Sequence, residues 1–356
     1  MDETPLKLED FLRTILDKKG SDVYIVPGAK VMAKVNDQLE PMSDAKLRLS
    51  DCEDLIRQIY ARAEGRRMER LEREGDDDFS FGLANMGRFR CSAFKQRGTL
   101  AAVLRVVPFQ LPDPKALHIP EAVLALSHKK RGMVLVTGPA GSGKTTTLAC
   151  IIDRINQSRS GHIITLEDPI EYIHSHKSCL VTQREMENDT LNFAHALRAS
   201  LRQAPDVILL GEMRDFETIQ TALTAAETGH LLFSTLHTLG ASKTIDRIVD
   251  VFPASQQQQV RIQLSMVLQA VVSQQLIPAA DGGIVPAFEV MLVNSAIANM
   301  IRENKVQQMD NVIYAGSSEG MISMDNDILR LYKEKRITRE NALLYAINTD
   351  VLLRRM

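Results

Sequence analysis

The sequence contains few cysteines, and they are widely separated along the chain. Its 356 residues include four, Cys52, Cys91, Cys150 and Cys179, and no two form a C-x-x-C motif. This scatter argues against a zinc site or a disulfide framework and fits a reducing compartment. The chain also lacks any apolar run near the roughly 18 residues that a membrane-spanning helix needs. We therefore expect no direct membrane insertion.

Targeting features and strong charge are missing as well. The first residues are acidic and polar, and no apolar segment follows them, so we expect no signal peptide. The formal net charge is −2 and the pI is about 6.5. No basic domain stands out, which argues against binding to a nucleic-acid backbone. With 44% hydrophobic and 25% charged residues, the chain has the balance of a globular protein of two or three domains.

The N-terminal third predicts a smaller α+β domain over residues 1–108. Apolar spacing and turn residues predict a helix, a hairpin, one or two helices and then three strands, an order typical of an antiparallel sheet. The corresponding segments are 6–18, 23–35, 49–73, 76–81, 87–94 and 99–107. A run of prolines follows, at positions 108, 112, 114 and 120. Because proline cannot donate to a strand ladder, we expect a linker at 109–118.

From residue 119 to 356 the pattern predicts a second domain of the α/β class. Short apolar strands alternate with helices, which is typical of a mostly parallel sheet covered by helices. The predicted strands are 133–137, 162–166, 207–210 and 231–235, the first helix is 144–156, and the tail from about 294 is largely helical.

A phosphate-binding loop is the clearest motif in the chain. It follows an apolar strand, precedes a helix and fits G-x-x-x-x-G-K-[ST]. Its residues, with the next helical position, are Gly138, Pro139, Ala140, Gly141, Ser142, Gly143, Lys144, Thr145 and Thr146. Glycines let backbone N–H groups turn toward phosphates, and the helix N-terminus adds partial positive charge. The motif predicts that Lys144 reaches the β- and γ-phosphates of ATP and that Thr145 binds Mg²⁺.

Hydrolysis also needs carboxylates near the metal and the attacking water. Glu167, Asp168 and Glu171 follow one predicted strand, where open α/β sheets bind ligands. The alternative is that Asp168 caps a helix and Glu171 is solvated. Glu212 ends a second strand and resembles a Walker B acid. Its alternative is a charged turn after an ordinary buried strand.

His237 ends a third apolar strand, after Ser234 and Thr235. This position favours a role in sensing the γ-phosphate, although a lone histidine is more often a hydrogen-bonded structural residue. A metal site is not expected, because no cysteine or histidine lies at ligand spacing from it.

These segments resemble the secretion ATPase superfamily and, within it, the PilT family of twitching-motility retraction ATPases. The resemblance runs from about residue 6 to 345. The matching motifs are GPAGSGKT at 138–145, ITLEDPIEY at 164–172, VTQRE at 181–185, LRQAPDVILLGEMRD at 201–215, TALTAAETGHLLFSTLHT at 221–238 and KTIDRIVDVFP at 243–253.

The resemblance implies a PAS-like N-terminal domain and a RecA-like P-loop ATPase domain in a homohexamer. It further implies that ATP hydrolysis drives disassembly of a type IV pilus. Such an enzyme is cytoplasmic and peripheral at the inner face of the cytoplasmic membrane, and its partner is the inner-membrane platform protein of the pilus.

Residue roles carry over from the family by position. The resemblance implies that Glu171 polarises the attacking water, that Glu212 is the Walker B acid and that His237 belongs to a histidine box. Arg90 and Arg105 match arginines that reach toward bound nucleotide, where a guanidinium can fork across phosphate oxygens. For each arginine the alternative is a surface salt bridge.

Two departures limit the resemblance. Assembly-type relatives carry a tetracysteine zinc motif that this chain lacks, which argues against pilus extension or type II secretion. The family motif AIRNLIRE is matched by AIANMIRE at 296–303, with Ala298 in place of the first arginine. An accessory, PilU-like paralogue or another secretion ATPase therefore stays open as an alternative.

Other function classes remain as competitors. A P-loop phosphotransferase would need an arginine-rich lid, and no such segment is found. A nucleic-acid translocase fits poorly with near-neutral charge. A non-hydrolysing scaffold would not need the acidic and histidine segments.

Overall fold

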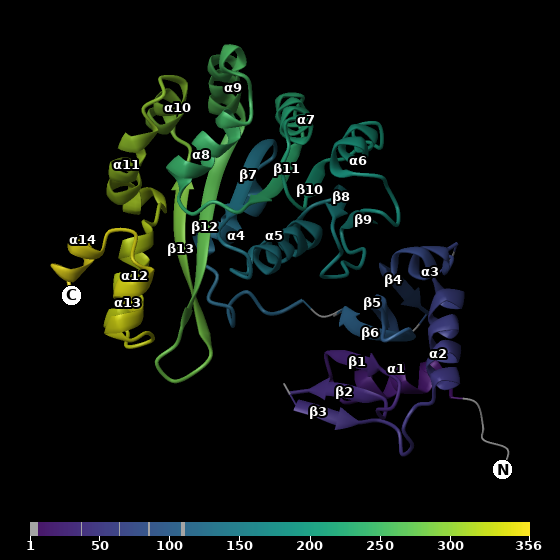
Figure 1. Cartoon of the computed structure of the whole chain (residues 1–356). Coiled ribbons are helices and arrows are strands. Elements are labelled where there is room, and N and C mark those ends of the chain that lie inside the picture. Colours follow the sequence, from purple (N-terminus) through teal and green to yellow (C-terminus); the bar gives the residue numbers. More distant parts are fainter. Residues whose placement is uncertain (1–5, 37, 64, 85, 108–110) are drawn as a thin grey trace. The chain divides into compact units, whose positions relative to one another are not determined.

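A computed structural model describes residues 6–36, 38–63, 65–84, 86–107 and 111–356. Contacts divide the chain into two units. The first comprises Met1–Gln110 with Pro169–Ile173, and the second comprises Leu111–Asp168 with His174–Met356 (Figure 1). The predicted linker 109–118 begins with two residues outside the described ranges, and Pro108 lies outside them too.

The first unit is built on an antiparallel sheet of six strands. Their order is β3-β2-β1-β6-β5-β4, and each neighbouring pair is antiparallel. The strands are β1 (Asp22–Ile25), β2 (Met32–Val35), β3 (Gln38–Pro41), β4 (Asp76–Leu83), β5 (Gly87–Gln96) and β6 (Thr99–Val107), and the helices are α1 (Leu8–Asp17), α2 (Leu49–Arg62) and α3 (Glu69–Glu74). The predicted helices and strands are all present.

Strand β3 was not predicted, because its sequence carries no apolar alternation. Its four residues are largely exposed, and it forms by backbone pairing with β2 from Met32↔Pro41 to Val35↔Gln38. Pairing of this kind depends on the neighbouring strand more than on local propensity.

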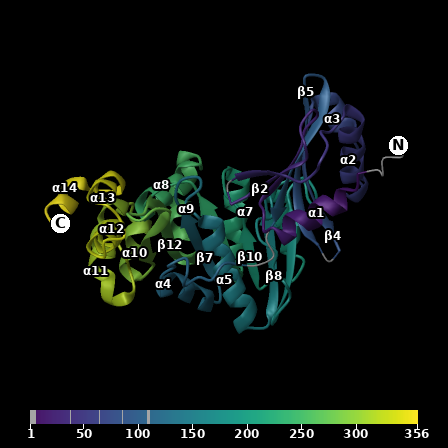
Figure 2. The same cartoon turned by 90° about the horizontal axis from the view of Figure 1, so that it is seen from below.

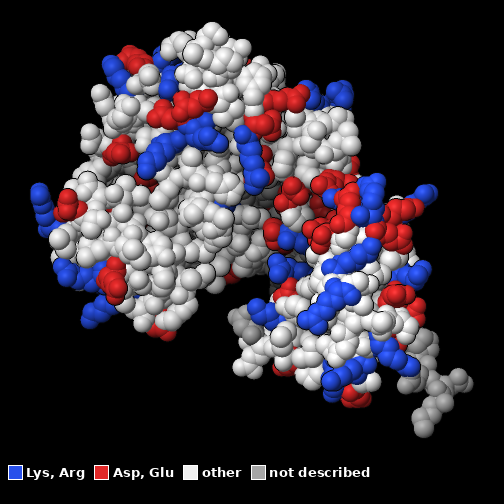
Figure 3. Space-filling view, in the orientation of Figure 1, with Lys and Arg blue, Asp and Glu red and all other residues white. Residues whose placement is uncertain are grey.

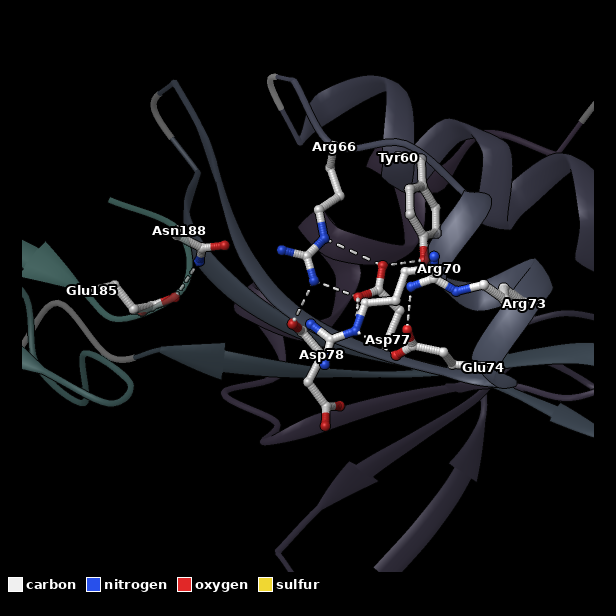
Figure 4. Close-up of polar contacts among 9 residues, drawn as sticks. All are labelled: Tyr60, Arg66, Arg70, Arg73, Glu74, Asp77, Asp78, Glu185 and Asn188. Carbon is white, nitrogen blue, oxygen red and sulfur yellow. Dashed lines mark hydrogen bonds and ion pairs between the residues drawn. The ribbon is translucent and has the colours of Figure 1, made fainter. Parts of the chain in front are cut away.

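The polar centre of the first unit is Asp77 on β4, which is almost fully buried. Tyr60 donates a 2.7 Å hydrogen bond to it, and Arg66 forms an ion pair with it (Figure 4). The Arg66 guanidinium also lies 5.0 Å from the centre of the Phe79 ring. Burial raises the pKa of the Tyr60 hydroxyl, and the hydrogen bond to Asp77 raises it further. These contacts join α2 to the sheet.

The second unit is built on a sheet of seven strands in the order β13-β12-β7-β11-β10-β8-β9. All neighbours are parallel except β12 and β13, which are antiparallel. The strands are β7 (Gly132–Thr137), β8 (Gly161–Glu167), β9 (Cys179–Glu185), β10 (Val207–Leu210), β11 (Leu231–Leu236), β12 (Leu268–Pro278) and β13 (Ile284–Leu292).

Helices cover both faces of this sheet (Figure 1 and Figure 2). One face packs against α4 (Glu121–Leu124), η1 (Ala125–His128) and α5 (Lys144–Ser158). The other packs against α6 (Phe193–Ser200), α7 (Phe216–Glu227), α8 (Ala241–Asp250), α9 (Ala254–Val267), α10 (Ser295–Arg302), η2 (Val306–Gln308) and α11 (Met309–Ala315). Strand residues alternate between these cores: Val134 and Val136 enter the first, and Met133 and Leu135 the second. Such continuous apolar runs are typical of strands buried on both faces.

The remaining helices follow β13. They are η3 (Gly316–Glu319), α12 (Met324–Lys333), α13 (Arg339–Tyr345) and α14 (Thr349–Leu353). The last three pack with the ends of β12 and β13 around a separate core that includes Ile277, Ile328 and Leu352. The helical tail predicted from about residue 294 is thereby confirmed.

Strands β9, β12 and β13 were missed. The clearest case is β12, which follows α9 with no intervening breaker, so periodicity alone could not separate the strand from the helix.

No helix in the described ranges combines the length and the apolar character needed to cross a membrane. Lysine, arginine, aspartate and glutamate side chains are visible on both units in the face drawn in Figure 3.

Candidate nucleotide-binding site

The phosphate loop joins the end of β7 to the start of α5. Three of its glycines have positive φ, at 140° for Gly138, 74° for Gly141 and 86° for Gly143. A Cβ atom on Gly138 would lie 2.2 Å from the carbonyl oxygen of Gln274, and one on Gly143 would lie 2.9 Å from the Gln274 Nε2. At Gly138 both the backbone angle and the backbone carbonyl nearby require glycine, and at Gly143 the positive φ favours it.

Lys144 is folded back onto the loop that precedes it. Its Nζ donates to the carbonyl oxygens of Gly138 and Pro139, both at 2.9 Å. The side chain is 8% exposed. Burial lowers the pKa of the ammonium, and the charge of Glu212 partly opposes this shift. The lysine thus lies within electrostatic reach of the predicted Walker B acid.

The loop and the start of α5 carry further polar groups beside Lys144. Ser142 is 2% exposed, and its Oγ has no hydrogen-bond partner among the described residues. Thr145 and Thr146 lie in the first turn of α5, whose N-terminal N–H groups favour an anion. An unpartnered hydroxyl, a buried cation and a helix N-terminus are what a phosphate group would need.

The carboxyl ends of β10 and β11 bring Glu212 and His237 together. Glu212 lies just after β10, and its Oε2 is 3.5 Å from the Nε2 of His237, just after β11. Arg214 Nε donates to the same oxygen at 2.7 Å. Thr235 Oγ1 donates to the carbonyl of Gly211 at 2.6 Å, which joins the two strand ends. Because the strands are parallel, their ends share one edge of the sheet with the loop.

Glu167 ends the neighbouring strand, β8, and Asp168 follows it. Glu167 is buried and accepts hydrogen bonds from Thr165 Oγ1 at 2.7 Å and Gln183 Nε2 at 3.2 Å. Burial raises the pKa of Asp168, and the nearby carboxylates of Glu187, Glu212 and Glu185 raise it further. The alternative in which Asp168 caps a helix is wrong, because residues 168–178 form no helix.

Glu171, Arg90 and Arg105 belong to the first unit by their contacts. Arg90 forms a 2.6 Å ion pair with Glu171. Arg105 lies opposite Arg90 in the β5–β6 register and opposite Asp22 in the β1–β6 register. Its Nε donates to Asp22 Oδ1 at 2.8 Å. Both arginines are thus ion-paired, and the roles predicted for all three residues toward nucleotide stay predictions.

The pKa of Asp22 shows that its ion pair outweighs burial. Burial is the largest single influence and raises this pKa, but the hydrogen bonds from Ser21 and Arg105, with the positive charge of Arg105, bring it below its usual range. This is the salt-bridge arrangement that the sequence left open for Arg105.

Two residues at the loop were not predicted from the sequence. Ser273 Oγ lies 2.7 Å from Thr137 Oγ1, and Gln274 Oε1 accepts a 2.7 Å hydrogen bond from Thr147 Oγ1. Both lie on β12, the strand that was missed. The available signal was three polar residues, at 273–275, directly after an apolar run from Ala270 to Val272.

Most of the chain matches a secretion-protein family model and two pilus ATPases. The family model described as Type II/IV secretion system protein matches residues 4–342. The chain is 46% identical to the Type IV pilus retractation ATPase PilT of Pseudomonas aeruginosa over 322 residues, which cover 90% of this chain and 93% of that protein. It is 39% identical to the Type IV pilus ATPase PilU of the same species over 348 residues, which cover 98% of this chain and 90% of PilU.

Solved structures agree with these relatives. A crystal structure of the pilus retraction motor PilT with bound ADP superposes with a TM-score of 0.89 at 46% identity, covering 99% of this chain and 100% of that one. The Legionella pneumophila ATPase DotB gives a TM-score of 0.82 at 27% identity, with 97% of each chain covered. Taken with the loop and its neighbouring strand ends, these matches establish that the chain belongs to the type II/IV secretion system protein family and has a RecA-like P-loop ATPase domain with a smaller PAS-like α+β domain.

Proposed function

We propose that this chain hydrolyses ATP and couples the reaction to retraction of a type IV pilus. The observation that carries the proposal is the loop 138–145, with buried Lys144 held on its carbonyl groups and Glu212 within electrostatic reach. The similarity to the retraction ATPase PilT along nearly the whole chain supports the choice of pilus retraction over other uses of a P-loop.

In this proposal the loop binds the phosphates of ATP. The Lys144 ammonium has three N–H donors, and the carbonyls of Gly138 and Pro139 accept two of them. A phosphate oxygen competes with these neutral carbonyls because its negative charge adds ion-pair attraction to the hydrogen bond from the ammonium. Backbone N–H groups of the loop and the Ser142 hydroxyl contribute further donors. Thr145 would hold a Mg²⁺ ion that arrives with the nucleotide, and the ion would supply positive charge to the phosphates.

Hydrolysis requires a second set of residues. We assign Glu212 to the metal side of the nucleotide, where Arg214 and His237 hold its carboxylate. Glu167 fixes the end of β8 at the same edge of the sheet, because it accepts hydrogen bonds from Thr165 and Gln183. Glu171 polarises the attacking water by accepting a hydrogen bond from it. Arg90 and Arg105 neutralise charge that develops on the phosphates.

We further propose that the chain works as a homohexamer at the inner face of the cytoplasmic membrane. Its partner there is the inner-membrane platform protein of the pilus. A role as an accessory, PilU-like ATPase is the second candidate, and two observations favour it. The similarity to PilU covers nearly the whole chain, and Ala298 on α10 replaces an arginine of the retraction motif.

Gene deletion followed by pilus counting tests the proposal. If the chain drives retraction, the deletion strain carries surplus pili that do not retract, and the cloned gene restores twitching. Bald cells would instead indicate pilus assembly. An unchanged pilus number with lost retraction force would indicate the accessory role. Purified protein that turns over no ATP, alone or with pilus components, would contradict the enzyme assignment.

A further inference from the structure

Strand β12 extends the sheet directly beneath the phosphate loop. It runs parallel to β7, with Val272 beside Val136 and Ser273 beside Thr137. The next residue, Gln274, therefore lies beside Gly138, the first residue of the loop. Since side chains alternate along a strand, Gln274 faces α5, whereas Ser273 and Gln275 face the opposite side.

Gln274 contacts three parts of the loop and helix. Its Oε1 accepts a 2.7 Å hydrogen bond from Thr147 Oγ1 in the first turn of α5. Its carbonyl oxygen and its Nε2 occupy the space that Cβ atoms on Gly138 and Gly143 would need. Gln274 is 4% exposed and Thr147 is 1% exposed, so water does not readily replace this hydrogen bond.

The strand that carries Gln274 is itself fixed. Ser273 Oγ lies 2.7 Å from Thr137 Oγ1, and it accepts the backbone N–H of Gly240 at 3.1 Å. These two contacts join the middle of β12 to the end of β7 and to the segment after His237. A side chain anchored on such a strand can hold the loop in one conformation.

We propose that the side chain of Gln274 is a positioning group, which holds the phosphate loop in its anion-binding conformation through Thr147 and beside Gly143. The inference rests on the proposed function, because it assumes that the loop binds ATP. Gln274 does not act on the reacting atoms. Its contribution is to reduce the ordering that the loop must undergo when a phosphate binds.

The first experiment replaces Gln274 with methionine, which keeps the side-chain volume and removes the hydrogen bond. A positioning role is shared by the ground state and the transition state, so the KM for ATP rises about tenfold while kcat stays near the wild-type value. A role in overall folding would instead lower the active fraction, with KM unchanged. The Kd for ADP, measured by calorimetry, should rise by about the same factor.

Gln275→Met is the matched control. Gln275 is the next residue of the same strand and is 7% exposed. It donates one hydrogen bond, from Nε2 to the carbonyl of Tyr345 at 3.2 Å, away from the loop. We expect its KM and its Kd for ADP to match those of the wild type, even if both variants unfold at a lower temperature.

A double-mutant cycle isolates the hydrogen bond to Thr147. Thr147→Val removes the hydroxyl and Thr147→Ser keeps it, so the valine variant should reproduce the loss in ADP affinity and the serine variant should largely restore it. Gln274→Met with Thr147→Val should be no weaker than either single variant, because both remove one interaction. Gln275→Met with Thr147→Val should be additive.

The outcomes separate this inference from the proposed function. Wild-type protein that binds neither ATP nor ADP would remove the basis of both. Wild-type binding with an unchanged KM and Kd in Gln274→Met would overturn the inference alone. Equal losses of ADP affinity in Gln274→Met and Gln275→Met would also overturn the inference. If Gln274→Met fails to fold, the Thr147→Val and Thr147→Ser pair decides.

Discussion

At the scale of single residues, the two groups with the clearest predicted roles each have a charged or polar partner in the structure. The ammonium of Lys144 is held by two loop carbonyls, and the carboxylate of Glu171 is held by Arg90. For nucleotide binding, Lys144 must therefore exchange a carbonyl partner for phosphate or contact both. For water activation, Glu171 must leave Arg90 or contact water and Arg90 together. Substitution of each should affect a different step.

Lys144→Ala should weaken nucleotide binding itself. A hydrogen bond to a charged group contributes about 1.5–3 kcal/mol, so we expect the Kd for ATP to rise about 10- to 100-fold. Calorimetry with a slowly hydrolysed ATP analogue measures this directly. Lys115→Ala is the control, because Lys115 is exposed and far from the loop in sequence. An ATP affinity equal to that of the wild type would contradict the assignment of Lys144.

Glu171→Gln should leave binding intact and remove most hydrolysis. Glutamine keeps the size of the side chain and loses only its charge, so it attracts the water proton far less strongly. General-base and polarising groups contribute about 10²–10⁴-fold to rates, so single-turnover hydrolysis should fall by roughly that factor. Glu340→Gln, at an exposed position on α13, should behave as wild type. Near-normal turnover in Glu171→Gln would reject the role.

At the scale of elements, β13 carries a carboxyl group that joins two helices. Glu289 is buried, and its Oε1 accepts the N–H of Ala241 at the start of α8 at 2.9 Å. It also accepts a backbone hydrogen bond from Met324 at the start of α12. The pKa of Glu289 is raised to about 7, chiefly by burial. The nearby carboxylates of Asp310 and Asp325 add to this rise, and the two backbone hydrogen bonds oppose it.

The raised pKa predicts a dependence of stability on pH. Because the folded state binds the proton more tightly than the unfolded state, the stabilisation is fully present below the unfolded pKa of 4.5 and is lost as the pH rises through about 7. The full loss is about 3.5 kcal/mol, from about 1.4 kcal/mol for each of the roughly 2.5 pKa units between 4.5 and about 7.

Glu289→Gln tests this dependence, because glutamine cannot ionise. Urea unfolding between pH 5 and pH 8 should show a larger loss of unfolding free energy in the wild type than in this variant. Glu340→Gln should keep the wild-type slope. Parallel pH profiles for wild type and Glu289→Gln would show that folding does not raise the pKa of Glu289.

At the scale of the whole molecule, the proposed ring makes the activity of each subunit depend on its neighbours. Six chains of 39.7 kDa would give an assembly of about 240 kDa, which light scattering can measure. Wild-type chains mixed with Lys144→Ala chains before assembly should then lose ATPase activity more steeply than their mole fraction. Mixing the same proteins after assembly is the control. A linear fall with mole fraction would show that subunits act independently.

Local sequence determined much of the secondary structure of this protein and the position of its phosphate loop. The phosphate loop, the strand before it and the helix after it could be predicted because they depend on glycine conformation, apolar runs and helix initiation within a dozen residues. The helices and strands of the first unit followed in the same way, apart from β3. Glu212 and His237 could be placed at strand ends because parallel strands end at one edge of a sheet.

Only the tertiary structure decided which distant residues meet these segments. Placing β12 beside β7 brings Gln274 under the loop, more than 120 positions from Thr147 in the chain, and strand register sets that contact. The pairing of Glu171 with Arg90 and the burial of Glu289 arise in the same way, from packing between segments far apart in sequence. Local patterns carry no information on such pairings, because the free energy that selects them comes from contacts formed only when the chain is folded.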